Sequence, residues 1–297
     1  MVAPPVHYPS PDEDNRRWLD FEHRDGDIVI STRSKHGTTW MQMICALLVF
    51  QRPDLPAPLA ELSPWLDWRV TPRDQVFEVL DRQTHRRIIK THTPLDGLPL
   101  DPRVTYIVVG RRPLDAAVSL YHQRANIDRA RLAELIGAEA PVDGGKRPTV
   151  DRWLSEWVIA QPDPRTALDS LPGVMHHLAD AWGRRATVEL VHYDDLLTDL
   201  PAQMNKLADR LELPMSPDLV QPATFAAMRA RSDELAPDPA RVLIDRHRFF
   251  RAGRSGTGRA ALDPRHLAIY EQHTTAAAPP DLLTWLHQPR SEVDTPR

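Results

Sequence analysis

A short segment near the amino terminus combines residue types that bind anions. Residues 31–40 read STRSKHGTTW, and Lys35 is one of only four lysines among 37 Lys plus Arg residues. Gly37, Thr38 and Thr39 follow, where a helix is expected to begin. Free N–H groups at a helix N-terminus favour negative charge, and hydroxyl and ammonium groups add donors. The spacing therefore predicts a phosphate-binding loop, although a solvated lysine beside a threonine N-cap would give the same pattern.

The segment differs from the P-loop of Mg-nucleotide enzymes. That loop has the pattern G-x-x-x-x-G-K-[ST], with its lysine directly after the second glycine. Here Lys35 stands two residues before Gly37, and no glycine precedes it in the loop. Such enzymes also tend to place an acid after a strand, and Asp194 or Asp195 occupies such a position. A nucleotide kinase-like phosphotransferase is therefore one alternative, and a non-catalytic nucleotide-binding protein is another.

The apolar patterning predicts the elements that must position this loop. Short buried runs at 27–32, 87–91, 104–110 and 187–192 are typical of strands covered on both faces. Helices are expected at 38–50, 113–124, 150–159, 174–182 and 200–211. The alternation favours an α/β fold, a single domain whose central parallel sheet is flanked by helices.

The residues that follow the predicted strands suit a polyanionic ligand. In open parallel sheets, ligands bind outside the carboxyl ends of the strands. In strand order, these ends carry the Lys35 loop, then Lys90-Thr91-His92, then Arg111-Arg112-Pro113 with Ser119, then Tyr193-Asp194-Asp195. Two of the four lysines, two adjacent arginines and two histidines would thus share one rim.

Composition limits the partners and the location. The net charge of −4 excludes the basic footprint of a nucleic-acid-binding protein. The single cysteine, Cys45, excludes an intrachain disulfide framework. The N-terminus has no apolar signal segment, and no apolar run approaches the ~20 residues that span a bilayer. We therefore expect a cytoplasmic protein with no membrane span and, from its His and Cys spacing, no metal site.

Six motifs resemble those of the PAPS-dependent cytosolic-type sulfotransferases, whose donor is 3′-phosphoadenosine 5′-phosphosulfate. In order, KHGTTW (35–40) is similar to the end of T-Y-P-K-S-G-T-T-W, KTHTP (90–94) to K-T-H-L-P, RRPLDAAVS (111–119) to R-N-P-x-D-x-x-x-S, YDD (193–195) to Y-E-D, TFAAM (224–228) to T-S-F-x-x-M, and FRAGRSG (250–256) to F-R-K-G-x-x-G. The resemblance implies a P-loop-kinase-like sulfotransferase fold. It also implies sulfuryl transfer from PAPS to a hydroxyl, less often an amine, of a small-molecule acceptor.

The resemblance implies a role for each matched residue. His92 would be the base, Lys35 would support the leaving phosphate, and Lys90 would support the sulfuryl group. The nucleotide-binding residues would be Lys35, His36, Gly37, Thr38, Thr39, Trp40, Arg111, Ser119, Tyr193, Thr224, Phe225, Met228, Phe250, Arg251, Ala252 and Gly253. The acceptor-binding residues would be Trp65, Trp68, His92 and Tyr121. The resemblance leaves the acceptor open between a phenol, a lipid and a glycolipid. A pure binder needs no base, so His92 and Lys35 favour an enzyme.

The chain departs from the family pattern in three places. Ser34 replaces the loop proline, and His36 replaces a serine. Ala252 replaces a lysine, and Thr257 with Gly258 replaces the pair D-W. The family's dimer motif, K-x-x-x-T-V-x-x-x-E, has no match, which leaves the oligomeric state open.

The remaining segments are interpreted as parts of one sulfotransferase domain over residues 1–297. Residues 1–20 are expected to form an N-terminal arm. Residues 127–149, which are poorly patterned, and residues 240–258 are expected to be flexible loops beside the acceptor or the donor. A short helix and a frayed end are expected after Pro279.

Overall fold

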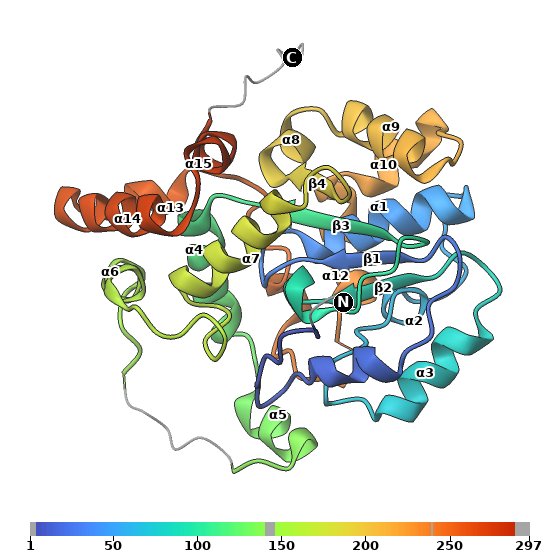
Figure 1. The fold of residues 1–297 in the computed structure, drawn as a ribbon, viewed down its shortest axis with the longest axis horizontal. Helices are drawn as coiled ribbons and strands as arrows, with labels where there is room; N and C mark the ends of the chain where they lie inside the picture. The colour runs from blue at the N-terminus through green and yellow to red at the C-terminus, as the bar shows by residue number, and fades with distance from the viewer. Residues whose placement is uncertain (1–3, 140–145, 239, 289–297) are drawn as a thin grey trace.

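A parallel sheet lies at the centre of the computed structural model, which describes residues 4–139, 146–238 and 240–288. The strand order is β2-β1-β3-β4 (Figure 1). The strands are β1 (Ile28–Ser31), β2 (Ile88–Thr91), β3 (Thr105–Gly110) and β4 (Glu189–His192). All four predicted strands are confirmed, and each is one or two residues shorter than the apolar run that indicated it.

The five predicted helices are also confirmed. They are α1 (Thr38–Phe50), α4 (Pro113–Arg124), α6 (Val150–Ile159), α7 (Leu171–Gly183) and α9 (Leu200–Leu211). Only α7 differs from its predicted bounds, because the Ser170 hydroxyl caps it by accepting from the N–H of Gly173 and so starts it earlier.

Further helices connect or follow these elements. They are η1 (Asn15–Asp20), α2 (Leu59–Leu62), α3 (Arg73–Arg82), η2 (Leu95–Gly97), α5 (Arg129–Ile136), α8 (Tyr193–Thr198), η3 (Pro217–Leu219), α10 (Val220–Ala223), α11 (Phe225–Ala230), α12 (Ser232–Leu235), η4 (Arg246–Arg248), α13 (Thr257–Ala260), α14 (Pro264–Ala277) and α15 (Pro280–His287). The helix expected after Pro279 is thus present as α15, and residues beyond 288 lie outside the described part.

Helices cover both faces of the sheet (Figure 1). Successive strand residues point to opposite faces, so the sheet contributes to two cores. Ile28 and Ile30 belong to a core that contains most of α1 and the apolar side of α9. Val29 belongs to a second core with Trp18 of η1 and Leu80 of α3. This layering makes the strand ends at one edge of the sheet the natural place for a cavity. No helix in the described ranges is long and apolar enough to cross a membrane.

The two segments interpreted as flexible loops are partly ordered by one another. An antiparallel bridge joins Ile127 to Leu243, with Asp128 N donating to Val242 O at 2.8 Å. The poorly patterned segment 127–149 contains α5, because the Asp128 side chain caps the helix and Gly137 ends it at φ 67°. Part of this segment is therefore helical, and its residues 140–145 lie outside the described part.

Candidate active site

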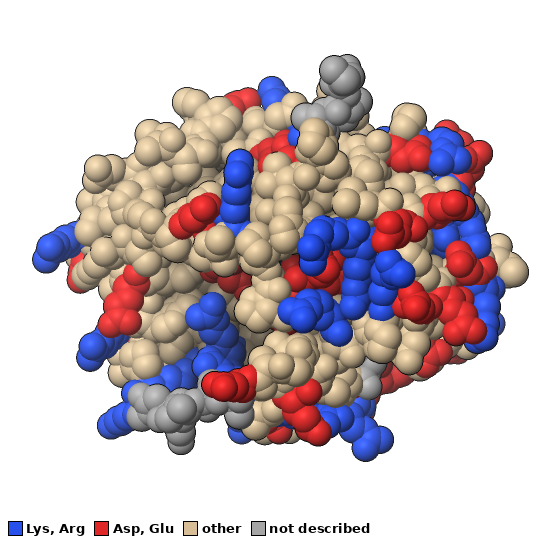
Figure 2. Space-filling view, turned by 60° about the horizontal axis from the view of Figure 1, so that its bottom comes forward, with Lys and Arg blue, Asp and Glu red and all other residues tan. Residues whose placement is uncertain are grey.

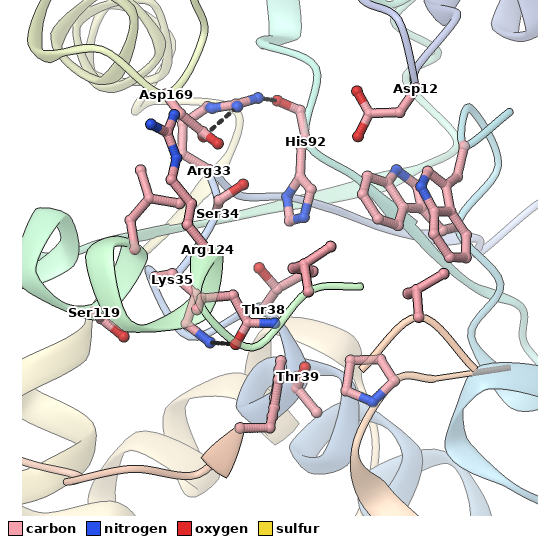
Figure 3. A pocket seen from close by; sticks show the side chains of 18 of the residues that line it. Asp12, Arg33, Ser34, Lys35, Thr38, Thr39, His92, Ser119, Arg124 and Asp169 are labelled. Carbon is pink, nitrogen blue, oxygen red and sulfur yellow. Dashed lines mark hydrogen bonds and ion pairs between the residues drawn. The ribbon is translucent and has the colours of Figure 1, made fainter. Parts of the chain in front are cut away.

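One cavity of about 760 Å³ opens at the carboxyl ends of the strands (Figure 3). Its lining includes Lys35 after β1, His92 after β2, Arg111 after β3 and Tyr193 after β4. Because the four strands are parallel, the groups that follow them share one edge of the sheet, as the sequence predicts. On the face shown in Figure 2, acidic and basic side chains are interspersed, and basic side chains also stand inside a hollow.

The turn between β1 and α1 depends on left-handed backbone conformations. Lys35 has a φ of 66°, and Gly37 has a φ of 108°. A Cβ on Gly37 would lie 2.9 Å from Cδ2 of the Tyr193 ring, so only glycine suits both the φ and the close approach. No side chain caps α1, which leaves its first N–H groups directed at the cavity edge that Thr38 and Thr39 line.

The Lys35 ammonium group stands among groups that do not neutralise it. Its Nζ lies 3.3 Å from Oε1 of Gln123 and 4.0 Å from the centroid of the Phe249 ring. Burial, reinforced by the Arg111 guanidinium and other nearby cations, lowers the pKa of Lys35 to about 7. An anion at this position would supply the missing countercharge.

The imidazole of His92 is fixed in one tautomer. Its Nδ1 hydrogen-bonds to the carbonyl oxygen of Thr32, so Nδ1 carries the proton and Nε2 keeps its lone pair. Burial and the nearby Lys90 and Arg33 charges hold the pKa of His92 well below its usual value. His92 lines the cavity, and Figure 3 shows its ring facing the interior. The site thus holds a neutral imidazole whose Nε2 has no hydrogen-bond partner among the described residues.

Lys90 and two tryptophans line the cavity beside His92. The Lys90 Nζ lies 3.9 Å from the centroid of the Trp65 ring, and His92 meets the same ring edge-on at 4.6 Å. Trp68 stacks on Trp65, with ring centroids 5.0 Å apart and planes 7° from parallel. Burial lowers the pKa of Lys90 to about 8.

A second cationic site lies on the other side of the Lys35 loop. Arg111 donates from Nη1 to the Lys35 carbonyl oxygen at 3.0 Å and from Nη2 to the Arg254 carbonyl oxygen at 3.1 Å. The Nε atoms of Arg111 and Arg251 are buried and have no hydrogen-bond partner in the described residues. Both arginines and Ser119 line the cavity, so this region offers donors that an anion would satisfy.

The segment that carries Arg251 is held in place by a buried carboxylate. Asp115 accepts from the N–H groups of Gly256 and Gly258, both at 2.8 Å. Gly253 has a φ of 57°, and a Cβ there would lie 2.4 Å from Cδ1 of Phe225. Phe250, Ala252 and Gly253 also line the cavity. The acid of the third motif therefore orients the sixth.

Aromatic side chains form one wall next to this arginine pair. Trp40 donates from Nε1 to the carbonyl oxygen of Ala223 at 2.8 Å, which fixes its ring. Tyr193 and Phe225 meet Trp40 edge-on, with centroids 5.4 Å and 6.2 Å away. Met228 completes the wall, which suits a planar aromatic ring.

Three residues of the predicted site do not line the cavity, namely His36, Thr224 and Tyr121. His36 is buried, and its Nδ1 lies 3.1 Å from the Ser34 carbonyl oxygen. Thr224 caps α11 by accepting from the N–H of Ala227.

Tyr121 hydrogen-bonds to Pro148 O at 2.7 Å, away from the cavity. At 3.6 residues per turn, the cavity-lining positions of α4 form one face, and position 121 lies off that face. The lining positions of α4 are Ser119, Leu120, Gln123 and Arg124.

The sequence reasoning missed an ion pair that braces His92. Arg33 donates from Nη2 to Oδ1 of Asp169 at 2.6 Å, and its Nη1 donates to the carbonyl oxygen of His92 (Figure 3). Arg33 is buried and Asp169 is partly exposed. The position of Arg33 beside the loop could have identified it from the sequence, whereas no local pattern identifies Asp169.

Comparison with known proteins identifies the family. A sequence model of the family described as "Sulfotransferase domain" matches residues 25–279. The chain belongs to the sulfotransferase family. A glycolipid sulfotransferase of Mycobacterium bovis is 41% identical, over 97% of this chain and 96% of its own length. A glycolipid sulfotransferase of Mycobacterium tuberculosis is also 41% identical, with the same coverage. This chain is therefore a sulfotransferase enzyme, as the motifs predict.

Solved structures share the fold of this sulfotransferase. A retinol dehydratase in complex with retinol and PAP, which is the donor without its sulfuryl group, superimposes with a TM-score of 0.66 at 18% identity, covering 93% of this chain and 86% of the other. A mouse sulfotransferase complexed with PAP gives a TM-score of 0.58 at 19% identity, covering 93% and 89%. At these identities the likeness shows the shared α/β fold, which confirms the predicted fold class.

Proposed function

We propose that this sulfotransferase transfers a sulfuryl group from PAPS to a hydroxyl, less often an amine, of a small-molecule acceptor. The observation that carries the proposal is the arrangement of three features in one cavity. These are the Lys35 loop, the arginine pair with unpartnered Nε atoms, and the His92 imidazole with a free Nε2. PAPS presents two separate anionic groups, which match two separate cationic sites. That two proteins of the same fold bind PAP agrees with this choice.

The Lys35 loop would support the leaving phosphate. Negative charge grows on the bridging oxygen as the sulfuryl group departs, and donors already aimed there lower the barrier. An ammonium group is a compact point charge that suits a single oxygen, whereas a guanidinium suits the three-oxygen face of a static phosphate. Lys35, the N–H groups of Gly37 and the hydroxyls of Thr38 and Thr39 would therefore hold the 5′-phosphosulfate.

The remaining contacts to PAPS would come from the second cationic site and the aromatic wall. Arg111, Arg251 and Ser119 would bind the 3′-phosphate, where the Nε atoms of the two arginines lack a hydrogen-bond partner in the described residues. The rings of Trp40, Tyr193 and Phe225 would contact the adenine, together with Met228. Glycine is required at 253 because a side chain would collide with the Phe225 ring.

His92 would accept the acceptor proton. A neutral imidazole at neutral pH, with Nδ1–H held by a backbone carbonyl, presents a lone pair in a defined direction. Lys90 comes from the same strand end and would support the transferring sulfuryl group, which itself carries little charge. In-line transfer places this base on the side of the sulfur away from the Lys35 loop.

The cavity has chemically different ends, which favours an amphiphilic acceptor. The end beside His92 is lined by Lys90, Glu13 and two tryptophans. Apolar residues of α5 and of the segment paired with it line another part of the wall. They include Ile127, Leu132, Ile136, Val242 and Leu243. We propose a glycolipid-like acceptor, which also agrees with the names of the two mycobacterial relatives.

PAP is expected to raise the melting temperature without added metal. A ligand that binds only the native state stabilises it by RT ln(1 + [L]/Kd), about 2.7 kcal/mol at a hundredfold excess over Kd. Differential scanning fluorimetry would compare PAP, ADP, and ATP with Mg²⁺, each in buffer containing or lacking EDTA. Stabilisation by ATP with Mg²⁺ and none by PAP would instead support a nucleotide kinase.

Arg111→Ala is expected to weaken PAPS binding by about 2–4 kcal/mol, because it removes charge-assisted contacts to the 3′-phosphate. Adenosine 5′-phosphosulfate lacks that phosphate, so its affinity should fall much less. Titration calorimetry with both nucleotides measures the difference. Arg111→Lys is the control, since it keeps a positive charge but loses the two-pronged geometry. Equal losses for the two nucleotides would place the 3′-phosphate elsewhere.

A further inference from the structure

Two buried polar atoms at the His92 end of the cavity have no hydrogen-bond partner in the described residues. They are Oε2 of Glu13 and the indole Nε1 of Trp65. Both residues line the cavity. The carboxyl oxygen is an acceptor, and the indole N–H is a donor only. A buried polar atom that is left unpaired destabilises the site, so a ligand that satisfied both atoms would gain affinity.

A continuous set of contacts connects these two atoms to the reacting centre. Glu13 forms an antiparallel bridge with Trp68, whose ring stacks on Trp65 at 5.0 Å. Trp65 in turn forms a bridge with Lys90 and contacts the His92 ring at 4.6 Å. The two unpartnered atoms therefore belong to the wall that faces an acceptor whose hydroxyl reaches His92.

A hydroxyl group matches this pair, because it donates one hydrogen bond and accepts another. Burial raises the pKa of Glu13 well above its usual value. In its neutral form, the carboxyl group can still accept through one oxygen and donate through the other. A purely apolar group would leave both atoms unpaired.

We propose that Glu13 and Trp65 form a subsite for a second hydroxyl of the acceptor, so that this sulfotransferase selects polyols such as sugar head groups over monohydroxy acceptors. The inference rests on the proposed function and adds a specificity determinant to it. The subsite arises from the N-terminal arm, which contributes Glu13. Figure 3 shows the Asp12 carboxylate at this same end of the cavity, which makes it polar.

The test compares acceptors that differ by one hydroxyl. With PAPS and wild-type protein, we expect kcat/KM for 1,2-decanediol to exceed that for 1-decanol by about a hundredfold or more. Sites built to bind a hydroxyl discriminate strongly against analogues without it. The kcat/KM for octyl β-glucoside, which carries several hydroxyls on an apolar tail, should also exceed that for 1-octanol.

Variants then assign the preference to the two side chains. Trp65→Phe removes the N–H and keeps an aromatic ring, so the diol-to-alcohol ratio should fall about tenfold. Glu13→Ala should lower the ratio by a similar factor, whereas Glu13→Gln, which keeps an acceptor oxygen and a donor, should retain most of it. Trp182→Phe is a control, because that indole N–H is bonded to Asp281 outside the cavity.

A binding measurement keeps the two proposals separable. In the presence of saturating PAP, octyl β-glucoside should bind wild type more tightly than Trp65→Phe or Glu13→Ala. If PAP binds but the diol and the alcohol react equally well, or the variants keep the wild-type ratio and glucoside affinity, the subsite is refuted and the proposed function stands. If PAP does not bind, the proposed function fails first.

Discussion

His92→Ala is expected to lower kcat by about 10²- to 10⁴-fold, while the affinity for PAP stays within a few-fold of wild type. The loss is the usual contribution of a positioned general base. PAP affinity should survive because the other cavity groups, the Lys35 loop and the arginine pair, lie apart from the imidazole. Rates at saturating PAPS, with PAP titrated by calorimetry, measure both quantities.

The matched control is His36→Ser, which replaces the second histidine near the loop. His36 does not line the cavity, its Nδ1 faces the Ser34 carbonyl oxygen, and burial lowers the pKa of His36 to about 4. This variant should therefore keep most of the activity. An inactive His36→Ser together with an active His92→Ala would move the base to His36.

The same assignment fixes the pH dependence on the acidic side. The base must be neutral to accept a proton, and the pKa of His92 is held well below the usual value near ~6.5. At saturating PAPS, kcat should therefore stay level as the pH falls from 7.5 to about 6.5, where an unperturbed histidine would already be half protonated. A rate that halves by pH 6.5 would show that the imidazole is not depressed in this way.

The sheet and the helices that frame the site could be predicted from local patterns alone. Helices α1, α4, α6 and α9 have the bounds that their apolar periodicity indicates. Helix α14 was missed because only Tyr270 and Thr274 of its fourteen residues are buried. Its N-cap Asp263 and first-turn Pro264 were signals that a search for apolar stripes ignores.

Some residues of the site could be predicted from their local sequence, and others could not. Groups directly after strands, such as Lys35 and Arg111, could be placed together because parallel strands end at one edge of a sheet. Arg33 and Asp169 are 136 positions apart, and no pattern near Asp169 predicts that the two residues pair. Glu13 reaches the cavity through a bridge to Trp68, a pairing that no periodicity indicates. Side chains that arrive from remote segments need the tertiary structure to be recognised.

Lys35→Met is expected to lower kcat by about 10²- to 10³-fold, because it removes the cation aimed at the charge that develops on the leaving oxygen. It should also change how PAP affinity depends on pH. In the free protein the pKa of Lys35 is about 7, and a bound phosphate favours its charged form. Wild-type PAP affinity should therefore fall as the pH rises above 7, by at most about tenfold per pH unit for one proton taken up.

Lys35→Arg separates the charge of this residue from its titration. A guanidinium stays protonated at any pH of interest, so this variant should bind PAP with a flatter profile between pH 6.5 and 8. The range ends at 8 because the pKa of Lys90, about 8, adds a slope of the same sign above it. Arg111 and Arg251, which also face Lys35, keep their charge throughout, and the phosphates of PAP are mostly dianionic above pH 7. Calorimetry of wild type, Lys35→Met and Lys35→Arg at four pH values is sufficient. If wild type shows no slope, or Lys35→Arg shows the wild-type slope, then Lys35 enters the complex already charged and its burial is not tuned to the donor phosphate.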